Sequence, residues 1–177
     1  MKLIVLDRDG VINHDSAAYI KTPNEWRPIA GSLNAISRLN QAGFHVIVAT
    51  NQSGIGRGFF DMAALNAIHD KMHKALAQAG ARIDAIYFCP HTAEDHCHCR
   101  KPKTGMFEDI ARRLNTPLAG VPLVGDSIRD LQAAATVGAL PMLVLTGNGK
   151  KTQRAGALPP GTRVFADLAA AVDAIAN

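Results

Sequence analysis

Short apolar runs alternate with stretches of helical periodicity along most of the chain. The apolar runs predict strands at residues 2–6, 44–49, 83–88, 122–124, 140–145 and 164–165. The patterns between them predict helices at residues 31–42, 62–78, 104–114 and 127–137, with one short helix allowed in the loop-rich stretch 147–161. Side chains suited to capping are Asp61, Thr104 and Asp167, the last of which opens a final helix. This alternation is typical of an α/β protein whose parallel sheet is covered by helices on both faces.

The composition supports a packed core. Of the 177 residues, 47% are hydrophobic and 19% are charged, so we expect a single domain over residues 1–177. The apolar runs are too short to cross a bilayer. The first run is followed at once by acidic residues, so it predicts a strand rather than a signal peptide. We therefore expect a cytoplasmic, monomeric protein with no membrane partner.

The formal net charge of +4 has two interpretations. Ordinary surface imbalance is the simpler one and is preferred, and a basic pocket for an anionic substrate is the alternative. The chain has no block of consecutive Lys and Arg residues, and aromatic residues make up 5% of it. The sequence therefore gives little support for nucleic acid as a partner.

Polar side chains follow the ends of several predicted strands. Asp7 and Asp9 follow the first strand, Thr50 and Asn51 the second, and Asp126 the fourth. The carboxyl ends of parallel strands meet at one edge of a sheet, where α/β proteins bind their ligands. We expect these side chains to converge there.

Asp7 and Asp9 lie two residues apart, so both carboxylates can point to the same side of an extended segment. Such a pair repels unless a cation or a proton lies between them, and Mg²⁺ with oxygen ligands fits. One carboxylate could then attack phosphorus while the other handles a proton. The competing interpretation is an ordinary turn, in which Asp and Gly are common.

The segment 50–53 offers hydroxyl, amide and backbone N–H donors for a phosphoryl group, and Arg57 adds a guanidinium. An ordinary polar turn is the alternative. Asp130, one helical turn after Asp126, has two interpretations of equal weight. In the first, its carboxylate holds a nearby cationic side chain or a water. In the second, its negative charge balances the positive end of a helix dipole.

Three cysteines and several histidines cluster within one short loop, at about residues 89–99. Cys89, His91, Cys97 and Cys99 form a Cys₃His set, which predicts a closed structural Zn²⁺ site. His96 and His98 compete for the place of His91, and unrelated thiols beside a histidine are the alternative. Bound zinc would order the loop, which leads directly into Arg100 and Lys101, two cations suited to a bound anion.

Four segments together resemble the haloacid dehalogenase-like phosphatase superfamily: DRDG from Asp7, TNQSG from Thr50, RKP around Lys101 and GDSIRD around Asp126. The resemblance spans most of the chain. It implies a Rossmann-like sheet without a cap domain, Asp7 as nucleophile and Asp9 as general acid and base. It also implies Mg²⁺ held by Asp7, the main-chain carbonyl of Asp9, and Asp126, with Thr50 and Lys101 stabilising the phosphoryl group.

Within this superfamily, the zinc loop CPH…CHCRKPKTGM is similar to that of the heptose bisphosphate phosphatase family. This implies a small sugar bisphosphate as substrate, hydrolysis at C7, and a role in making surface polysaccharides. Histidinol-phosphate phosphatases carry a similar loop and remain an alternative, although GIGRG favours the heptose family. A polynucleotide 3′-phosphatase and a non-catalytic, zinc-stabilised interaction domain are further alternatives. The substrate contacts expected are Asp15, Ser16, Tyr19, Asn51, Gln52, Ser53, Arg57 and Arg100.

Overall fold

A computed structural model describes residues 1–176 and shows that they form one six-stranded sheet with every neighbouring pair parallel. The strand order is β3-β2-β1-β4-β5-β6. The strands are β1 (Lys2–Leu6), β2 (Phe44–Asn51), β3 (Ala85–Cys89), β4 (Pro122–Gly125), β5 (Leu140–Val144) and β6 (Arg163–Phe165). The predicted α/β class and all predicted strands are confirmed.

The helices also follow the predicted pattern, with differences at their ends. They are α1 (Ser32–Gln41), α2 (Ser53–Gly56), α3 (Met62–Gln78), α4 (Gly105–Leu114), α5 (Ile128–Thr136), α6 (Gly149–Ala155) and α7 (Leu168–Asp173), with 3₁₀ turns η1 (Pro23–Glu25) and η2 (Ala93–Asp95). The short helix α2 was not predicted. Asp61 and Asp167 cap α3 and α7 through their carboxylates, as expected. Thr104 is the N-cap residue of α4, as expected, but its hydroxyl bonds Glu108 rather than a backbone N–H, so the expected side-chain cap was wrong.

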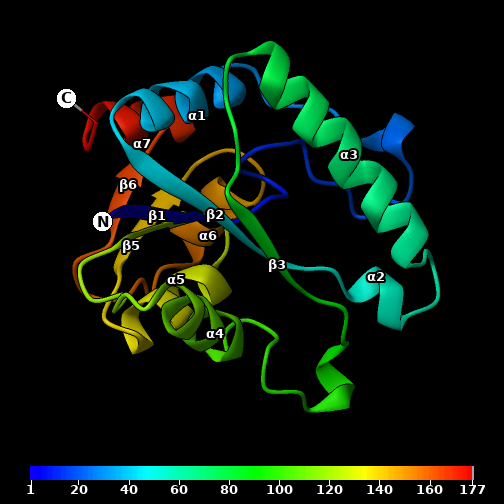
Figure 1. The fold of residues 1–177 in the computed structure, drawn as a ribbon. Coiled ribbons are helices and arrows are strands. Elements are labelled where there is room, and N and C mark those ends of the chain that lie inside the picture. Colours follow the sequence, from blue (N-terminus) through cyan, green and yellow to red (C-terminus); the bar gives the residue numbers. More distant parts are fainter. Residues whose placement is uncertain (177) are drawn as a thin grey trace.

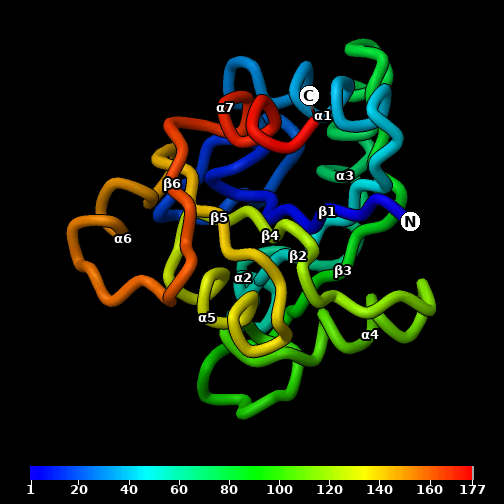
Figure 2. The backbone as a smooth tube through the Cα atoms, turned by 90° about the vertical axis from the view of Figure 1, so that its left-hand side faces the viewer, coloured from blue at the N-terminus to red at the C-terminus, as the bar shows by residue number. Residues whose placement is uncertain are grey.

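Helices cover both faces of the sheet (Figures 1 and 2). Helices α1, α3 and α7 lie on one face, and α4 and α5 lie on the other. Alternate residues of β1 serve the two layers: Ile4 and Leu6 pack with the first group, and Leu3 and Val5 with the second. This two-sided burial is why the strands are apolar almost throughout.

The chain winds outward from β1 in both directions, first through β2 and β3 and later through β4, β5 and β6. The carboxyl end of β1 is therefore the switch point of the sheet, with the ends of β2 and β4 on either side. A crevice at such a point is where ligands bind in open α/β sheets.

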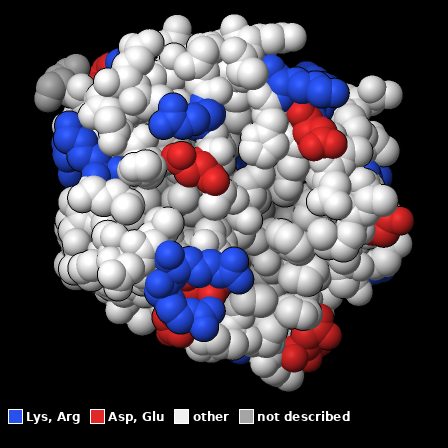
Figure 3. Space-filling model, viewed as in Figure 1, with Lys and Arg blue, Asp and Glu red and all other residues white. Residues whose placement is uncertain are grey.

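Charged side chains are spread over the surface. In Figure 3, Lys and Arg form separate groups, several of them beside Asp or Glu. One such group lies over α4, where Arg112 and Arg113 both pair with Asp109. Among residues 1–176, none of the helices is both long enough and apolar enough to span a bilayer.

The segment 7–28, which we call the flap, leaves the end of β1 and is fastened to α3. Trp26 is 1% exposed, and the Lys71 ammonium of α3 donates to the main-chain oxygens of Pro23 at 2.7 Å and Trp26 at 2.8 Å. The same ammonium lies 5.9 Å from the centre of the Trp26 ring. Lys71 therefore fixes the far end of the segment whose near end borders the switch point.

Replacing Lys71 by Met keeps the apolar stem and removes the donor to both carbonyls. We expect the free energy of unfolding to fall by about 1–3 kcal/mol, because two part-buried acceptors lose their partner. Urea unfolding followed by circular dichroism measures this. Lys74→Met, at an exposed position of the same helix, is the control and should change stability by less than about 0.5 kcal/mol. An unchanged midpoint for Lys71→Met would show that this contact does not hold the flap.

Candidate active site

Three carboxylates and one ammonium meet at the switch point of the sheet. Oxygens of Asp7, Asp126 and Asp130 all lie within 4.8 Å of one another. The Lys101 Nζ lies 3.1 Å from Asp7 Oδ1 and 2.7 Å from Asp130 Oδ1. The predicted convergence of Asp7 and Asp126 is thus what the structure shows, and Lys101, expected to face a bound anion, lies beside them.

Lys101 is held by the sheet as well as by these carboxylates. It is 3% exposed, and its ammonium also donates to the main-chain oxygen of Ala49 in β2 at 2.7 Å. The side-chain amide of Asn51 bonds the main chain of Lys101 in both directions, accepting at 3.0 Å and donating at 3.2 Å. Asn51, expected as a substrate contact, therefore also anchors the segment that carries Lys101.

Asp130 performs both of the roles considered for it. Its Oδ2 accepts from the N–H and the hydroxyl of Ser127, each at 3.2 Å, which caps the start of α5. Its Oδ1 holds Lys101. Gly125 allows this approach, since a Cβ there would collide with the Asp130 carboxylate. Both oxygens are thus engaged with protein donors, so Asp130 serves to position Lys101.

Burial of so much negative charge changes the acidity of the carboxyls. Desolvation, with the nearby Asp130 charge second, raises the pKa of Asp7 well above its usual value, although Lys101 opposes this. Desolvation and Asp130 likewise raise the pKa of Asp126 to about 7. Burial lowers the pKa of Lys101, but Asp130 and Asp7 more than compensate and raise it. A cation bound between Asp7 and Asp126 would stabilise both in their charged forms.

Asp9 has the opposite environment. Burial raises its pKa, but the Arg8 guanidinium and hydrogen bonds from Asn13 and Gln52 outweigh burial and lower it. Asp9 Oδ1 accepts from two Arg8 nitrogens and from Asn13 Nδ2, and Oδ2 accepts from Gln52 Nε2 at 3.1 Å. The two aspartates of DRDG are therefore electrostatically distinct.

Thr50 and Gln52 lie beneath the site. Thr50 and Asn51 belong to β2, two residues beyond the predicted strand end, because they pair with Phe88 and Cys89 of β3. Gln52 is 4% exposed, and its amide donates both to Asp9 and to the Thr50 hydroxyl, the latter at 2.9 Å. Gln52, expected to contact substrate, thus connects Thr50 to Asp9.

A cavity of about 370 Å³ opens above these groups. It is lined by Asp7, Asp9, Asp15, Ser16, Ala17, Tyr19, Ile20, Asn51, Gln52, Ser53, Arg57, Arg100, Lys101, Asp126, Ser127, Arg129, Asp130 and Asn148. All eight residues expected to contact substrate are in this lining. Asp15, Ser16 and Tyr19 come from the flap, and three arginines, Arg57, Arg100 and Arg129, are also among the lining residues.

Sequence reasoning missed the segment after β5. The N–H of Asn148 donates to Asp126 Oδ2 at 2.8 Å, and its side-chain amide donates to Asp15 Oδ2 at 3.0 Å. The hydroxyl of Thr152 donates to the main-chain oxygen of Asp126 at 2.8 Å. The rule that led to Asp7 and Asp126 would have found this segment too, because it follows the end of a parallel strand.

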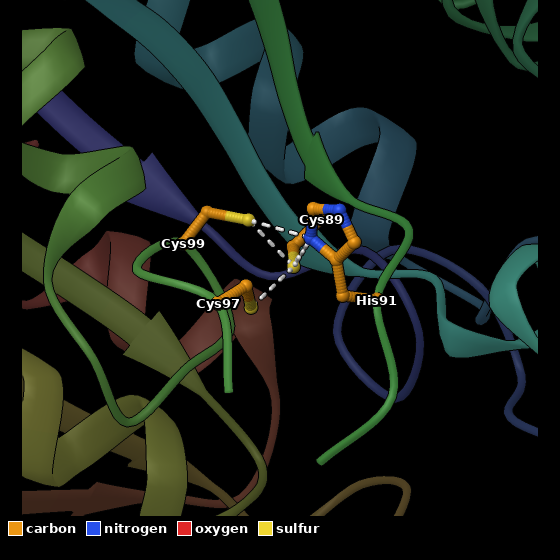
Figure 4. A group of neighbouring side chains, drawn as sticks. All are labelled: Cys89, His91, Cys97 and Cys99. Atoms are coloured by element: carbon orange, nitrogen blue, oxygen red, sulfur yellow. Dashed lines mark hydrogen bonds between the residues drawn. The ribbon is translucent and has the colours of Figure 1, made fainter. Parts of the chain in front are cut away.

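The four predicted zinc ligands form a second group (Figure 4). Cys89 Sγ lies 3.6 Å from Cys97 Sγ, 3.5 Å from His91 Nδ1 and 2.7 Å from Cys99 Sγ, and His91 Nδ1 lies 3.3 Å from Cys99 Sγ. His91 is thus the histidine that joins the thiols. The competing His98 instead bonds Glu108 at 2.9 Å.

The parallel sheet and the strand-end carboxylates with their buried lysine define a haloacid dehalogenase-like hydrolase. Two family models match: the HAD-hydrolase-like model over residues 98–171 and the polynucleotide kinase 3 phosphatase model over residues 2–131. The chain belongs to the family of the D-glycero-β-D-manno-heptose-1,7-bisphosphate 7-phosphatases.

The relatives that show this are similar along nearly their whole length. A protein of that name from Bordetella bronchiseptica is 63% identical over 98% of this chain and 97% of its own. One from Neisseria meningitidis is 55% identical over 95% of this chain and 91% of its own.

Solved structures agree. The crystal structure of D,D-heptose 1,7-bisphosphate phosphatase from B. bronchiseptica, complexed with magnesium and phosphate, matches with a TM-score of 0.97 at 62% identity, over 99% of this chain and 98% of the other. The Burkholderia thailandensis enzyme matches with a TM-score of 0.80 at 53% identity, over 100% of both chains.

The raised pKa of Asp126 makes the metal-free protein sensitive to pH. A carboxyl whose pKa rises from 3.8 to about 7 on folding gives stability that is fully present below pH 3.8 and is lost as pH rises through 7. Asp126→Asn stays neutral, so without metal we expect it to be more stable than the wild type at pH 8, by on the order of 1–4 kcal/mol, and by less at pH 5.

Thermal unfolding of both proteins, dialysed into Mg²⁺-free buffer without a chelator, at the two pH values measures this difference. Adding Mg²⁺ should raise the melting temperature of the wild type more than that of the variant. A constant difference between the two proteins from pH 5 to pH 8 would contradict the shifted pKa.

Proposed function

We propose that this chain hydrolyses the C7 phosphate of D-glycero-β-D-manno-heptose 1,7-bisphosphate through an aspartyl-phosphate intermediate on Asp7. The observation that carries the proposal is the contact of the Asp7 carboxylate with a buried ammonium, Lys101, beside Asp126 in the cavity wall. The choice of substrate rests on the family, since these relatives are named for this activity and for the β anomer.

The residues present fit a magnesium ion. Asp7 and Asp126 offer carboxylate oxygens from neighbouring strand ends, and their pKa values are raised by burial and by more negative charge than Lys101 offsets. The main-chain oxygen of Asp9 is the third protein ligand in our proposal, in keeping with the preference of Mg²⁺ for few carboxylates plus water and phosphate. The solved relative with magnesium and phosphate supports this choice of ion. When bound, the ion would neutralise charge on the phosphoryl oxygens.

The chain's own side chains divide the reaction into two steps. Asp7 attacks phosphorus, the bond between phosphorus and the sugar oxygen breaks, and the protonated form of Asp9 gives its proton to the departing oxygen. Burial raises the pKa of Asp9, but Arg8 and the hydrogen bonds from Asn13 and Gln52 outweigh burial and lower it, so this protonated form is the minor one at neutral pH. Asp9, now ionised, takes a proton from a water that attacks the aspartyl-phosphate, which frees Asp7 and inorganic phosphate. Lys101 and Thr50 stabilise the phosphoryl oxygens throughout.

The rest of the cavity suits a sugar that carries a second phosphate. Arg57 and Arg100 are among the residues that line it, and a guanidinium group matches the geometry of a phosphate group. Asp15, Ser16 and Tyr19 of the flap offer hydrogen-bonding groups for sugar hydroxyls. We propose that these five residues select the substrate, and that residues 1–177 form one catalytic domain.

A comparison of kcat/KM tests the proposed substrate. The panel consists of the β and α anomers of the heptose bisphosphate, histidinol phosphate, and an oligonucleotide with a 3′-phosphate, because one matching family model bears a polynucleotide name. We expect the β heptose bisphosphate to be preferred and turnover to require Mg²⁺. Preference for histidinol phosphate or the oligonucleotide would reject the proposed substrate.

Asp7→Asn tests the mechanism in the same assay. We expect activity to fall by on the order of 10⁴-fold or more, as losing a nucleophile does elsewhere, with an unchanged circular dichroism spectrum. Appreciable turnover by the well-folded variant would overturn the assignment of Asp7.

We also propose that Cys89, His91, Cys97 and Cys99 hold a structural Zn²⁺. Two sulfurs on one tetrahedral zinc lie about 3.8 Å apart and a sulfur and a nitrogen about 3.5 Å apart, given bonds of about 2.3 and 2.0–2.1 Å. The separations of 3.6, 3.5 and 3.3 Å are close to these values. Cys89 and Cys99, at 2.7 Å, would move apart by about 1 Å on binding the ion.

Cys97→Ser tests this zinc site and its link to catalysis. With zinc bound less tightly, we expect the melting temperature to fall by about 5–10 °C. We expect kcat/KM to fall about 10-fold or more at saturating Mg²⁺, because the loop positions Lys101. Zinc content by atomic spectroscopy is measured alongside. His98→Ala changes a residue outside the proposed ligand set, so it is the control and should keep its zinc. Finding no zinc in the purified wild-type protein would contradict the site.

A further inference from the structure

Arg8, between the two aspartates of DRDG, is enclosed by the protein. It is 0% exposed although it carries a guanidinium, and it is among the largest fully buried side chains. Burying a charge is unfavourable unless the charge is paired and its donors are satisfied. The partners of Arg8 therefore indicate what it does.

Those partners are Asp9 and a histidine from α3. Arg8 Nε and Nη2 donate to Asp9 Oδ1 at 3.0 and 2.8 Å, and Nη1 lies 3.1 Å from His69 Nε2. Arginine can only donate, so His69 Nε2 accepts and the imidazole is neutral, with its proton on Nδ1. Consistent with this, desolvation, followed by the charges of Arg8 and His73, lowers the pKa of His69 to about 4, although Asp9 opposes the shift.

The two oxygens of Asp9 are consequently unequal. Oδ1 accepts from both Arg8 nitrogens and from Asn13 Nδ2 at 2.9 Å, whereas Oδ2 accepts from Gln52 at 3.1 Å. A fork of two donors to one oxygen, with a third from Asn13, fixes the rotation of the carboxylate. Asp9 lines the cavity, while Arg8 and His69 are not part of its described lining.

We propose that Arg8, oriented by a neutral His69 of α3, is a positioning residue that fixes the Asp9 carboxylate so that Oδ2 exchanges the proton with the leaving group and with water. The inference deepens the proposed function and rests on it. Arg8 acts through Asp9 and does not contact the substrate. Helix α3, which also fastens the flap through Lys71, thereby helps to set the direction of proton transfer.

The test uses leaving groups that differ in their need for a proton. A sugar alkoxide leaves only when protonated, whereas 4-nitrophenolate leaves as a stable anion. The kcat/KM value reports the steps up to the first irreversible one, here formation of the aspartyl-phosphate. A defect in the placement of Asp9 therefore lowers kcat/KM for the heptose bisphosphate much more than for 4-nitrophenyl phosphate.

His69→Leu removes the acceptor for Arg8 and adds no charge. We expect kcat/KM for the heptose bisphosphate to fall about 10- to 100-fold, within the range of a general acid's contribution, and that for 4-nitrophenyl phosphate by less than about 3-fold. His69→Gln, whose carbonyl can accept from Arg8, should restore the first value to within about 3-fold. His73→Leu, at an exposed position of the same helix, is the matched control and should change neither value.

Arg8→Lys, which keeps the charge but loses the fork, should show the same selective loss and carries the test if His69→Leu does not fold. Equal losses for both substrates, or no loss for either, would overturn the proposal. A wild type that turns over the aryl phosphate but not the heptose bisphosphate would instead count against the proposed function. The selective loss is then measured on the alkyl phosphate that the wild type prefers.

Discussion

Repulsion among buried carboxylates at the end of β1 is the constraint on which the rest of the site depends. Asp7 is far in sequence from Asp126 and Asp130, yet oxygens of all three lie within 4.8 Å of one another with one ammonium, Lys101, among them. Such a group is unfavourable in a folded protein without compensation. The sheet, the capping of α5 and the hydrogen bonds to Lys101 hold it together, and a divalent ion in the proposed position would relieve it.

The same constraint explains the small residues around the site. A Cβ at Gly10 or Gly147 would collide with the Asp126 carboxylate, and one at Gly125 would collide with that of Asp130. The backbone at these three glycines therefore packs directly against the carboxylates of Asp126 and Asp130, which leaves no room for a side chain. Asn148 and Thr152 add donors to Asp126, so the segment after β5 contributes to a site whose acidic groups follow β1 and β4 or belong to α5.

The two aspartates of DRDG show how surroundings separate chemically identical groups. Burial, followed by the charge of Asp130, raises the pKa of Asp7, whereas Arg8 and the hydrogen bonds from Asn13 and Gln52 outweigh burial and lower the pKa of Asp9. Without a metal these directions are opposite to the proposed roles, because a nucleophile acts ionised and a general acid acts protonated. A cation bound between Asp7 and Asp126 would stabilise the ionised form of Asp7. The group of thiols around His91 also helps to position Lys101. The loop that carries these thiols continues directly into Lys101, and the main chain of Lys101 is bonded to Asn51 of β2.

The sequence by itself determined the α/β alternation, because apolar runs and helical periodicity are local consequences of burial. It also indicated Asp7 and Asp126, since strand ends in a parallel sheet share one edge, and it indicated the thiol group because its members are neighbours in sequence. Lys101 was indicated by its place directly after that group and by the RKP segment of the family resemblance. Tertiary structure alone decided the pairing of Arg8 with His69, the link from Gln52 to Asp9, the double role of Asp130 and the part played by Asn148. Each of these depends on which side chain from a distant element comes within hydrogen-bonding distance, and packing of the whole sheet and its helices sets that distance.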